Sequence, residues 1–199
     1  TDEKIHNRLS GNLAGYRKAC EAILHIKKLK QQAYVGFTAT KENIQDAGDV
    51  MDLSFALCAD GLSIYRFVPT GKGLHNQELL MPSVSQINDA LEILDDKSSQ
   101  YKMDVFMGIP ICTSLLRRKL RNIKMTNCQA GLTKFTIDYL GNLRLCEQNP
   151  NIVGNLFEEN FLSLILSKEV REFRALAKKS NGDCPLLFRK EHFLSASTV

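Results

Sequence analysis

The stretch CQAGLTKFTIDYLGNLRLC, residues 128–146, decides how the second half of this 199-residue chain folds. Apolar and polar residues alternate over 135–138 and again over 143–146, which is typical of two half-exposed strands. The residues between them, YLGN, predict a tight turn and therefore a β-hairpin, with Asp138 capping the turn rather than acting as an acid. We expect the hairpin to bring the thiols of Cys128 and Cys146 side by side. Two such soft ligands suit zinc or an iron–sulfur cluster.

The six cysteines fall into two groups by their local sequence. Cys20 and Cys58 lie within amphipathic helical patterns, so we expect both to be small buried core residues. The other four lie next to glycine, proline or turn residues, and they are Cys112, Cys128, Cys146 and Cys184. The chain opens on TDEK rather than on a basic and then apolar leader. We therefore expect reduced thiols in a cytoplasmic protein, and not a disulfide framework.

The composition limits the classes of partner. Hydrophobic residues make up 44% of the chain, which is enough for a core, and the net charge is only +4. No apolar run approaches the roughly 20 residues that a membrane span requires, so no membrane partner is expected. The basic run RRKLRNIK, residues 117–124, is interpreted as a solvated helical face. No aromatic residues alternate with its charges, so no nucleic-acid partner is expected.

The first half of the chain predicts parallel α/β units. Strand-like runs at 33–39 and 62–68 alternate with helical patterns at 12–31, 43–58 and 82–96. Beyond residue 111 the pattern changes to the hairpin and a single helix over 158–178. We place the domain boundary between residues 105 and 106, which gives domains 1–105 and 106–199.

Several short motifs of the second half resemble, in kind and order, the C-terminal SPASM or twitch region of radical S-adenosylmethionine (SAM) enzymes. The motifs are Cys128 to Gly131, Ile137-Asp138, Gly141-Asn142, Cys146, Val153-Gly154-Asn155, Ser167 to Arg174, and Cys184. The resemblance implies a small α+β domain in which Cys112, Cys128, Cys146 and Cys184 hold one auxiliary [4Fe–4S] cluster. No cysteine follows Cys184, so a second auxiliary cluster is not expected.

The first half resembles the second half of the same family's partial (β/α)6 TIM-like barrel. Residues 5–11 look like the segment after the fourth strand, 38–44 like the fifth strand and its turn, and 66–72 like the end of the sixth. The implied SAM contacts are Arg8, to the carboxylate, Thr38 and Thr40, and Phe67 and Val68, against the adenine. The alternative for Arg8 is an ordinary surface arginine, and for the other four it is barrel core.

One departure from the family pattern changes what we expect of the chain's activity. The radical-generating cluster of the family is bound by C-x-x-x-C-x-x-C, and this triplet is absent from the 199 residues. The chain therefore resembles a C-terminal portion, whose partner would be the missing N-terminal half of the barrel with the SAM-binding [4Fe–4S] cluster. We expect it to be inactive without that half. A ferredoxin or flavodoxin would be the electron donor.

The resemblance predicts an oxidoreductase or maturase that abstracts a hydrogen from its substrate with a 5′-deoxyadenosyl radical. A peptide is the favoured substrate, and a tetrapyrrole or another small metabolite is the alternative. A different class of function also remains open at this point, in which the chain is a non-catalytic module that holds zinc or a cluster on the four thiolates.

Overall fold

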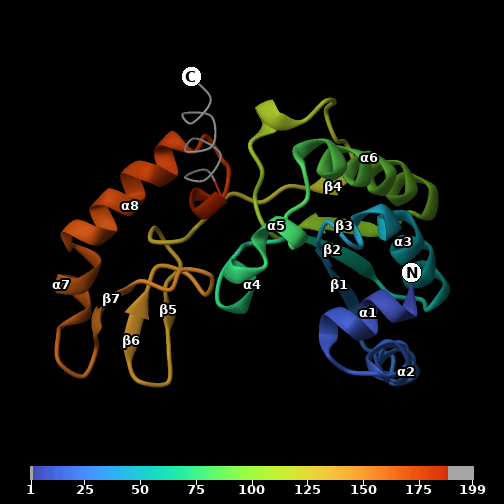
Figure 1. The fold of residues 1–199 in the computed structure, drawn as a ribbon, viewed down its shortest axis with the longest axis horizontal. Helices are drawn as coiled ribbons and strands as arrows, with labels where there is room; N and C mark the ends of the chain where they lie inside the picture. The colour runs from blue at the N-terminus through green and yellow to red at the C-terminus, as the bar shows by residue number, and fades with distance from the viewer. Residues whose placement is uncertain (1, 188–199) are drawn as a thin grey trace. The chain divides into compact units, whose positions relative to one another are not determined.

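The computed structural model describes residues 2–187. The chain forms two compact units (Figure 1). The sheet unit comprises Thr1–Phe67, Gln77–Ile109 and Leu116–Thr126. The cysteine unit comprises Val68–Asn76, Pro110–Leu115 and the chain from Asn127 onward. The boundary proposed between residues 105 and 106 stays a prediction.

The sheet unit is built on a parallel sheet whose strands follow one another in chain order. They are β1 (Tyr34–Ala39), β2 (Gly61–Arg66), β3 (Asp104–Met107) and β4 (Ile123–Lys124). Every neighbouring pair is parallel, which confirms the predicted parallel α/β units. Gly61 begins β2 at a point where a Cβ atom would lie 2.8 Å from the backbone oxygen of Asp104 and 2.9 Å from the Tyr34 ring. Only glycine therefore allows this close approach of the strands.

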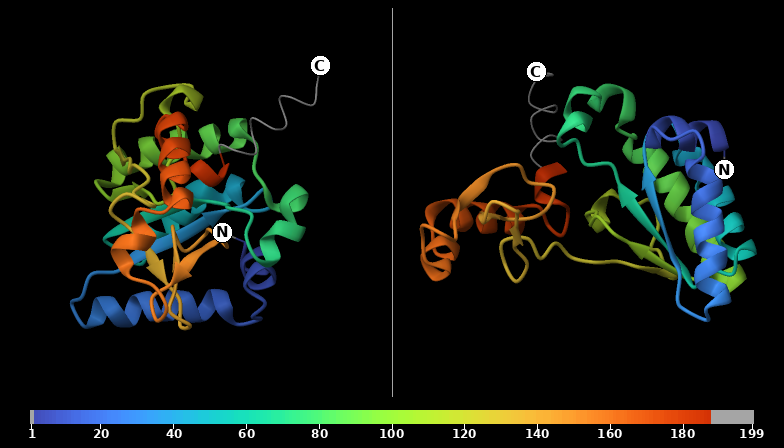
Figure 2. Two further views of the ribbon diagram at one scale, coloured as in Figure 1. Left: turned by 90° about the vertical axis from the view of Figure 1, so that its left-hand side faces the viewer. Right: turned by 90° about the horizontal axis from the view of Figure 1, so that it is seen from below.

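Two helices, α3 (Ala47–Ala56) and α6 (Val84–Tyr101), pack on the sheet and on each other (Figure 2). The short 3-10 helix η1 (Ile44–Asp46) leads into α3, and α5 (Gln77–Leu80) precedes α6. A capping box at Ser83 starts α6, because its hydroxyl accepts from the N–H of Gln86 while the Gln86 side chain accepts from Ser83 N–H. Buried apolar side chains from the strands and from these helices form the core: Leu62, Ile64, Val105, Met107, Met51, Leu91 and Leu94.

Two further helices, α1 (Glu3–Ser10) and α2 (Gly15–Lys28), lie against each other at the start of the chain and bury no residue fully. The predicted helix over 12–31 is thus confirmed in shorter form. The expectation that Cys20 and Cys58 are buried core residues is wrong. Cys20 is half-buried, and Cys58 is exposed because it adopts a left-handed conformation with φ of 58° just after α3 ends.

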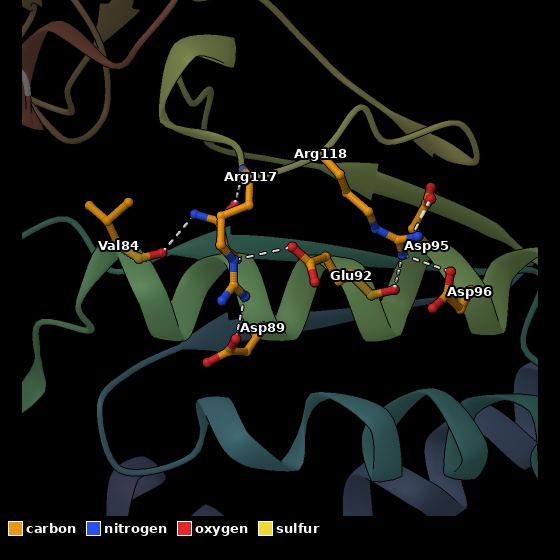
Figure 3. A network of polar contacts seen from close by, with 8 residues as sticks. Val84, Asp89, Glu92, Asp95, Asp96, Arg117 and Arg118 are labelled. Atoms are coloured by element: carbon orange, nitrogen blue, oxygen red, sulfur yellow. Dashed lines mark hydrogen bonds and ion pairs between the residues drawn. The ribbon is translucent and has the colours of Figure 1, made fainter.

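The basic run over 117–124 is not a helical face, which corrects the prediction. It forms an irregular segment that leads into β4, and its arginines pair with carboxylates of α6 (Figure 3). Arg117 pairs with Asp89, and Arg118 lies 2.7 Å from Asp96. Asp95, only 3% exposed, accepts from the backbone N–H groups of Arg121 at 2.9 Å and Asn122 at 2.7 Å. Asp95 therefore holds the backbone of Arg121 and Asn122 in place directly before β4.

The cysteine unit contains an antiparallel sheet and two helices. Its strands are β5 (Thr136–Ile137), β6 (Asn142–Arg144) and β7 (Ile152–Asn155), in that order across the sheet. The predicted helix over 158–178 is instead two helices, α7 (Phe161–Ile165) and α8 (Lys168–Lys179). Ser167 separates them, because its hydroxyl accepts from Val170 N–H and caps α8. The short helices α4 (Lys72–His75) and η2 (Thr113–Leu115) complete this unit.

The hairpin between β5 and β6 is held by the carboxylate of Asp138. One oxygen accepts from the N–H groups of Leu140 and Asn142, at 3.0 and 3.1 Å. The other accepts from the Asn142 side chain at 3.1 Å and from Arg144 at 2.9 Å. Asp138 therefore caps the turn, as predicted. Burial alone would raise the pKa of Asp138, but the hydrogen bonds from Asn142, Leu140 and Arg144 together lower it below its usual value.

Gly141 completes the turn with φ of +79°. A Cβ atom at Gly141 would lie 2.6 Å from the Phe157 ring, so a side chain is excluded both by conformation and by space. Within residues 2–187, no helix has the length and apolar character needed to cross a membrane.

Substitution of Asp95 tests whether it anchors the segment before β4. We expect Asp95→Ala to lower the free energy of unfolding by about 2 kcal/mol, because two hydrogen bonds to a charged group are lost. Asp96→Ala removes an exposed ion pair and should cost less than about 1 kcal/mol. Urea unfolding followed by circular dichroism compares the two variants, and equal losses would contradict the role of Asp95.

The lowered pKa of Asp138 predicts how the hairpin responds to acid. Its stabilisation is present above the unfolded pKa of about 3.9 and is lost as the pH falls through the lower folded value. We therefore expect Asp138→Asn to destabilise the protein at neutral pH, and the difference from wild type to shrink in acid. The urea midpoint measured from pH 7 down to about pH 3 checks this, with exposed Asp96→Asn as the control. A difference that stays constant across this range would count against a charged Asp138.

Candidate metal centre

All four cysteines predicted as ligands lie in the cysteine unit, and none of the four forms a disulfide. Cys128 and Cys146 are half-buried and pack against one apolar cluster, formed by Ala130, Leu145, Val170 and Phe173. Gly131 follows Ala130, and its carbonyl oxygen accepts from Arg174 of α8 at 2.7 Å. This bond ties the residues after Cys128 to the helix that supplies Val170 and Phe173.

The Cys146 thiol is partly shielded from solvent. Burial raises the pKa of Cys146 above its usual value, and the nearby backbone of Gln148 and Asn149 opposes the rise. Asn149 N–H donates to the carbonyl oxygen of Cys146 at 3.2 Å, which closes the turn that follows Cys146.

Cys112 and Cys184 are the more deeply buried pair, at 7% and 8% exposure. The Cys112 sulfur lies 3.0 Å from the Ser114 hydroxyl and 3.6 Å from the side-chain nitrogen of Asn181. Cys184 follows the same turn as Asn181, and its N–H donates to Asp183 at 2.7 Å. Leu186, two residues further on, packs against the apolar cluster that also contacts Cys128 and Cys146.

The donor set fits an iron–sulfur cluster in its chemistry. It offers four reduced thiols, two buried and two half-buried, and polar side chains contact the sulfur of Cys112. Across the part of the chain that the structure describes, no three His, Cys, Asp or Glu side chains are grouped as ligands of one metal ion. A [4Fe–4S] cluster takes one thiolate per iron, so its four sulfurs do not converge on a single point.

Four of the five predicted SAM contacts gather at the carboxyl ends of β1 and β2. Ala39 and Arg66 are paired at this edge, so Thr38, Thr40 and Phe67 lie beside them, and Phe67 N–H donates to Ala39 at 3.2 Å. Arg8 is brought to the same edge by an ion pair of 2.6 Å with Glu42. Val68 is half-buried and belongs to the cysteine unit, so its placement relative to the other four is not described.

These side chains differ in how accessible they are. Thr38 is exposed, and 64% of the Arg8 side chain is exposed despite its ion pair. Thr40 is buried, and its hydroxyl and N–H both donate to the side chain of Asn43, at 3.0 and 2.7 Å. Thr40 therefore holds the turn after β1.

Sequence reasoning missed the polar residues around the candidate ligands. Ser114 and Asn181 both contact the Cys112 sulfur. Ser114 is only two residues from Cys112, whereas Asn181 lies 69 residues away and no local pattern links it to Cys112. The Asn-Gly pair at 181–182 is a recognisable signal for a left-handed turn after a helix. It indicates the conformation of Asn181 but not the sulfur that its side chain reaches.

Comparisons with known proteins agree with the geometry of the cysteine unit. Residues 128–185 match the family model of the SPASM iron–sulfur cluster-binding domain, a range that includes Cys128, Cys146 and Cys184. The chain is also 24% identical over 162 residues to the PqqA peptide cyclase of Bradyrhizobium diazoefficiens. That alignment covers 77% of this chain but only 40% of the relative, so the chain spans well under half of the relative's length. The C-terminal part of this chain is therefore a SPASM-type iron–sulfur cluster-binding domain.

Proposed function

We propose that this chain is the C-terminal portion of a radical SAM enzyme that modifies a peptide through a 5′-deoxyadenosyl radical. The observation that carries the proposal is the SPASM match over 128–185 together with the similarity to PqqA peptide cyclase. The aligned 162 residues are more than the cysteine unit contains, so the similarity extends into the parallel sheet. A peptide is the proposed substrate class because the relative's name specifies a peptide.

The cysteine unit would hold one auxiliary [4Fe–4S] cluster on Cys112, Cys128, Cys146 and Cys184. When bound, such a cluster supplies one-electron transfer. Four protein thiolates would occupy every iron, which argues for electron relay or a structural role and against direct ligation of substrate. The protein's part is to shield the sulfurs from solvent and to place polar side chains against them, as it does at Cys112 with Ser114 and Asn181.

The sheet unit would form the second half of a partial (β/α)6 barrel. In β/α barrels the carboxyl ends of the strands face the active site, and Arg8, Thr38, Thr40 and Phe67 lie at those ends of β1 and β2. Val68 is proposed as a further SAM contact. Arg8 is already paired with Glu42, so a SAM carboxylate would take the place of the Glu42 carboxylate as its partner.

The remaining parts would come from outside these 199 residues. The sequence contains no C-x-x-x-C-x-x-C motif, so the SAM-binding cluster and the first barrel strands would be supplied by a separate segment or partner. A cytoplasmic ferredoxin or flavodoxin is the proposed electron donor.

Anaerobic reconstitution with iron and sulfide tests the cluster. We expect the wild-type chain to bind about four irons and four sulfides and to show broad visible absorbance. A Cys128→Ala/Cys146→Ala variant should lose both, because half of the thiolate ligands are removed. Cys58→Ala is the matched control, since Cys58 is exposed and outside the proposed set, and it should behave as wild type.

Two results would contradict the cluster proposal. One is a colourless wild-type protein that holds a single zinc ion, which would favour the non-catalytic module. The other is full cluster content in the Cys128→Ala/Cys146→Ala variant, which would show that the ligands lie elsewhere.

Reductive cleavage of SAM tests whether radical generation requires a segment outside these 199 residues. We expect the reconstituted chain with dithionite to form no 5′-deoxyadenosine, because it lacks the radical-generating motif. Addition of a polypeptide that carries C-x-x-x-C-x-x-C and the first barrel strands should restore the activity, as measured by chromatography of the nucleoside. Turnover by this chain alone would contradict the proposal.

A further inference from the structure

The sulfur of Cys112 has two polar side chains as neighbours, although the residue is only 7% exposed. The Ser114 hydroxyl lies 3.0 Å away and the side-chain amide of Asn181 lies 3.6 Å away. Both distances are within the range of hydrogen bonds to sulfur. A buried structural cysteine behaves as a small apolar residue and does not require such donors. Either atom of the Cys112–Ser114 pair can be the donor, and a thiolate at Cys112 would accept hydrogen bonds from both side chains.

The turn that presents Asn181 is fixed by its own hydrogen bonds. Asn181 has φ of 49° and directly follows Ser180, the C-cap of α8. The buried Ser180 hydroxyl donates within the turn, where the carbonyl oxygens of Ala177 and Asp183 lie 2.8 and 2.9 Å away. The backbone that carries Asn181 is thus held by hydrogen bonds on either side of it.

We propose that Asn181 and Ser114 are positioning residues that donate hydrogen bonds to the thiolate of Cys112 and thereby raise the reduction potential of the auxiliary cluster. The inference rests on the proposed cluster. Asn181 offers amide N–H groups, and Ser114 must be the donor once Cys112 is a thiolate. A donor at a ligand sulfur stabilises negative charge there, and the reduced cluster is the more negative state.

Cys112 is the ligand at which this effect can be tested by substitution. At Cys112 both donors are side chains.

The substitutions must separate hydrogen bonding from backbone conformation, because asparagine is also favoured in the left-handed region. Asn181→Gly retains that conformation and removes the donor. Asn181→Asp also tolerates the conformation, but it replaces the donor by a negative charge. Ser114→Ala removes the second donor from a different segment of the chain. Asn160→Asp is the matched charge control, since Asn160 caps α7 by accepting from Leu162 N–H and aspartate can do the same.

The test is a redox titration of the anaerobically reconstituted full chain, followed by electron paramagnetic resonance. We expect a lower midpoint potential for Asn181→Gly and for Ser114→Ala, a larger decrease for Asn181→Asp, and a decrease in the double variant Ser114→Ala/Asn181→Gly that exceeds either single one. Asn160→Asp should leave the potential near the wild-type value. If Asn181→Gly failed to retain the cluster, the decrease expected for Ser114→Ala would still decide the matter.

The contradicting outcomes separate this inference from the proposed function. Unchanged potentials in Asn181→Gly and Ser114→Ala would overturn the inference and leave the cluster proposal standing. A shift in Asn160→Asp as large as that in Asn181→Asp would overturn it too, since general charge would then explain the effect. A wild-type chain that takes up no cluster would overturn the proposed function, and the inference with it.

Discussion

The turn held by the Asp138 carboxylate is the constraint on which the cysteine unit depends. Four hydrogen bonds converge on this one side chain, and they fix the spacing between β5 and β6. The hairpin in turn places Leu145 in the apolar cluster and Cys146 at its border. Helix α8 closes the cluster with Val170 and Phe173, and its C-terminal turn leads to Cys184. Without a fixed hairpin, the candidate ligands would have no common core against which to pack.

The sequence predicted those secondary-structure elements that depend only on neighbouring residues. The alternation at 135–138 and 143–146, the YLGN turn and the role of Asp138 could be read from neighbouring residues. The strands at 34–39 and 61–66 were also predictable, because their apolar runs are bounded by turn residues. Strands β3, β4 and β7 were not predicted, whereas the equally short β5 and β6 were, because a recognisable turn joins them. The same applies to the segment 117–124, whose arginines suit a helix but whose path is set by Asp89, Asp95 and Asp96 on α6.

The candidate ligands were identifiable from sequence because a resemblance linked residues that are far apart in the chain. The SPASM match over 128–185 supports the choice of that region. Burial was harder to predict: Cys58 sits in a helical pattern, yet the helix ends before it and leaves it exposed. The contact of Asn181 with Cys112 could not be predicted, because the two residues are 69 positions apart and meet only through the tertiary fold. Candidate ligands can be recognised in the sequence by residue type, whereas the polar groups that surround them depend on tertiary packing.

The chain passes between its two units several times, since 68–76 and 110–115 belong to the cysteine unit while their flanking residues belong to the sheet unit. Neither unit is therefore one continuous stretch of the chain. A gene fusion or deletion with a single breakpoint could not transfer the cysteine unit intact to another protein, because it would leave two of its three segments behind. Removal of all residues before Asn127 would thus also remove Cys112, which lies on the segment Pro110–Leu115 of the cysteine unit.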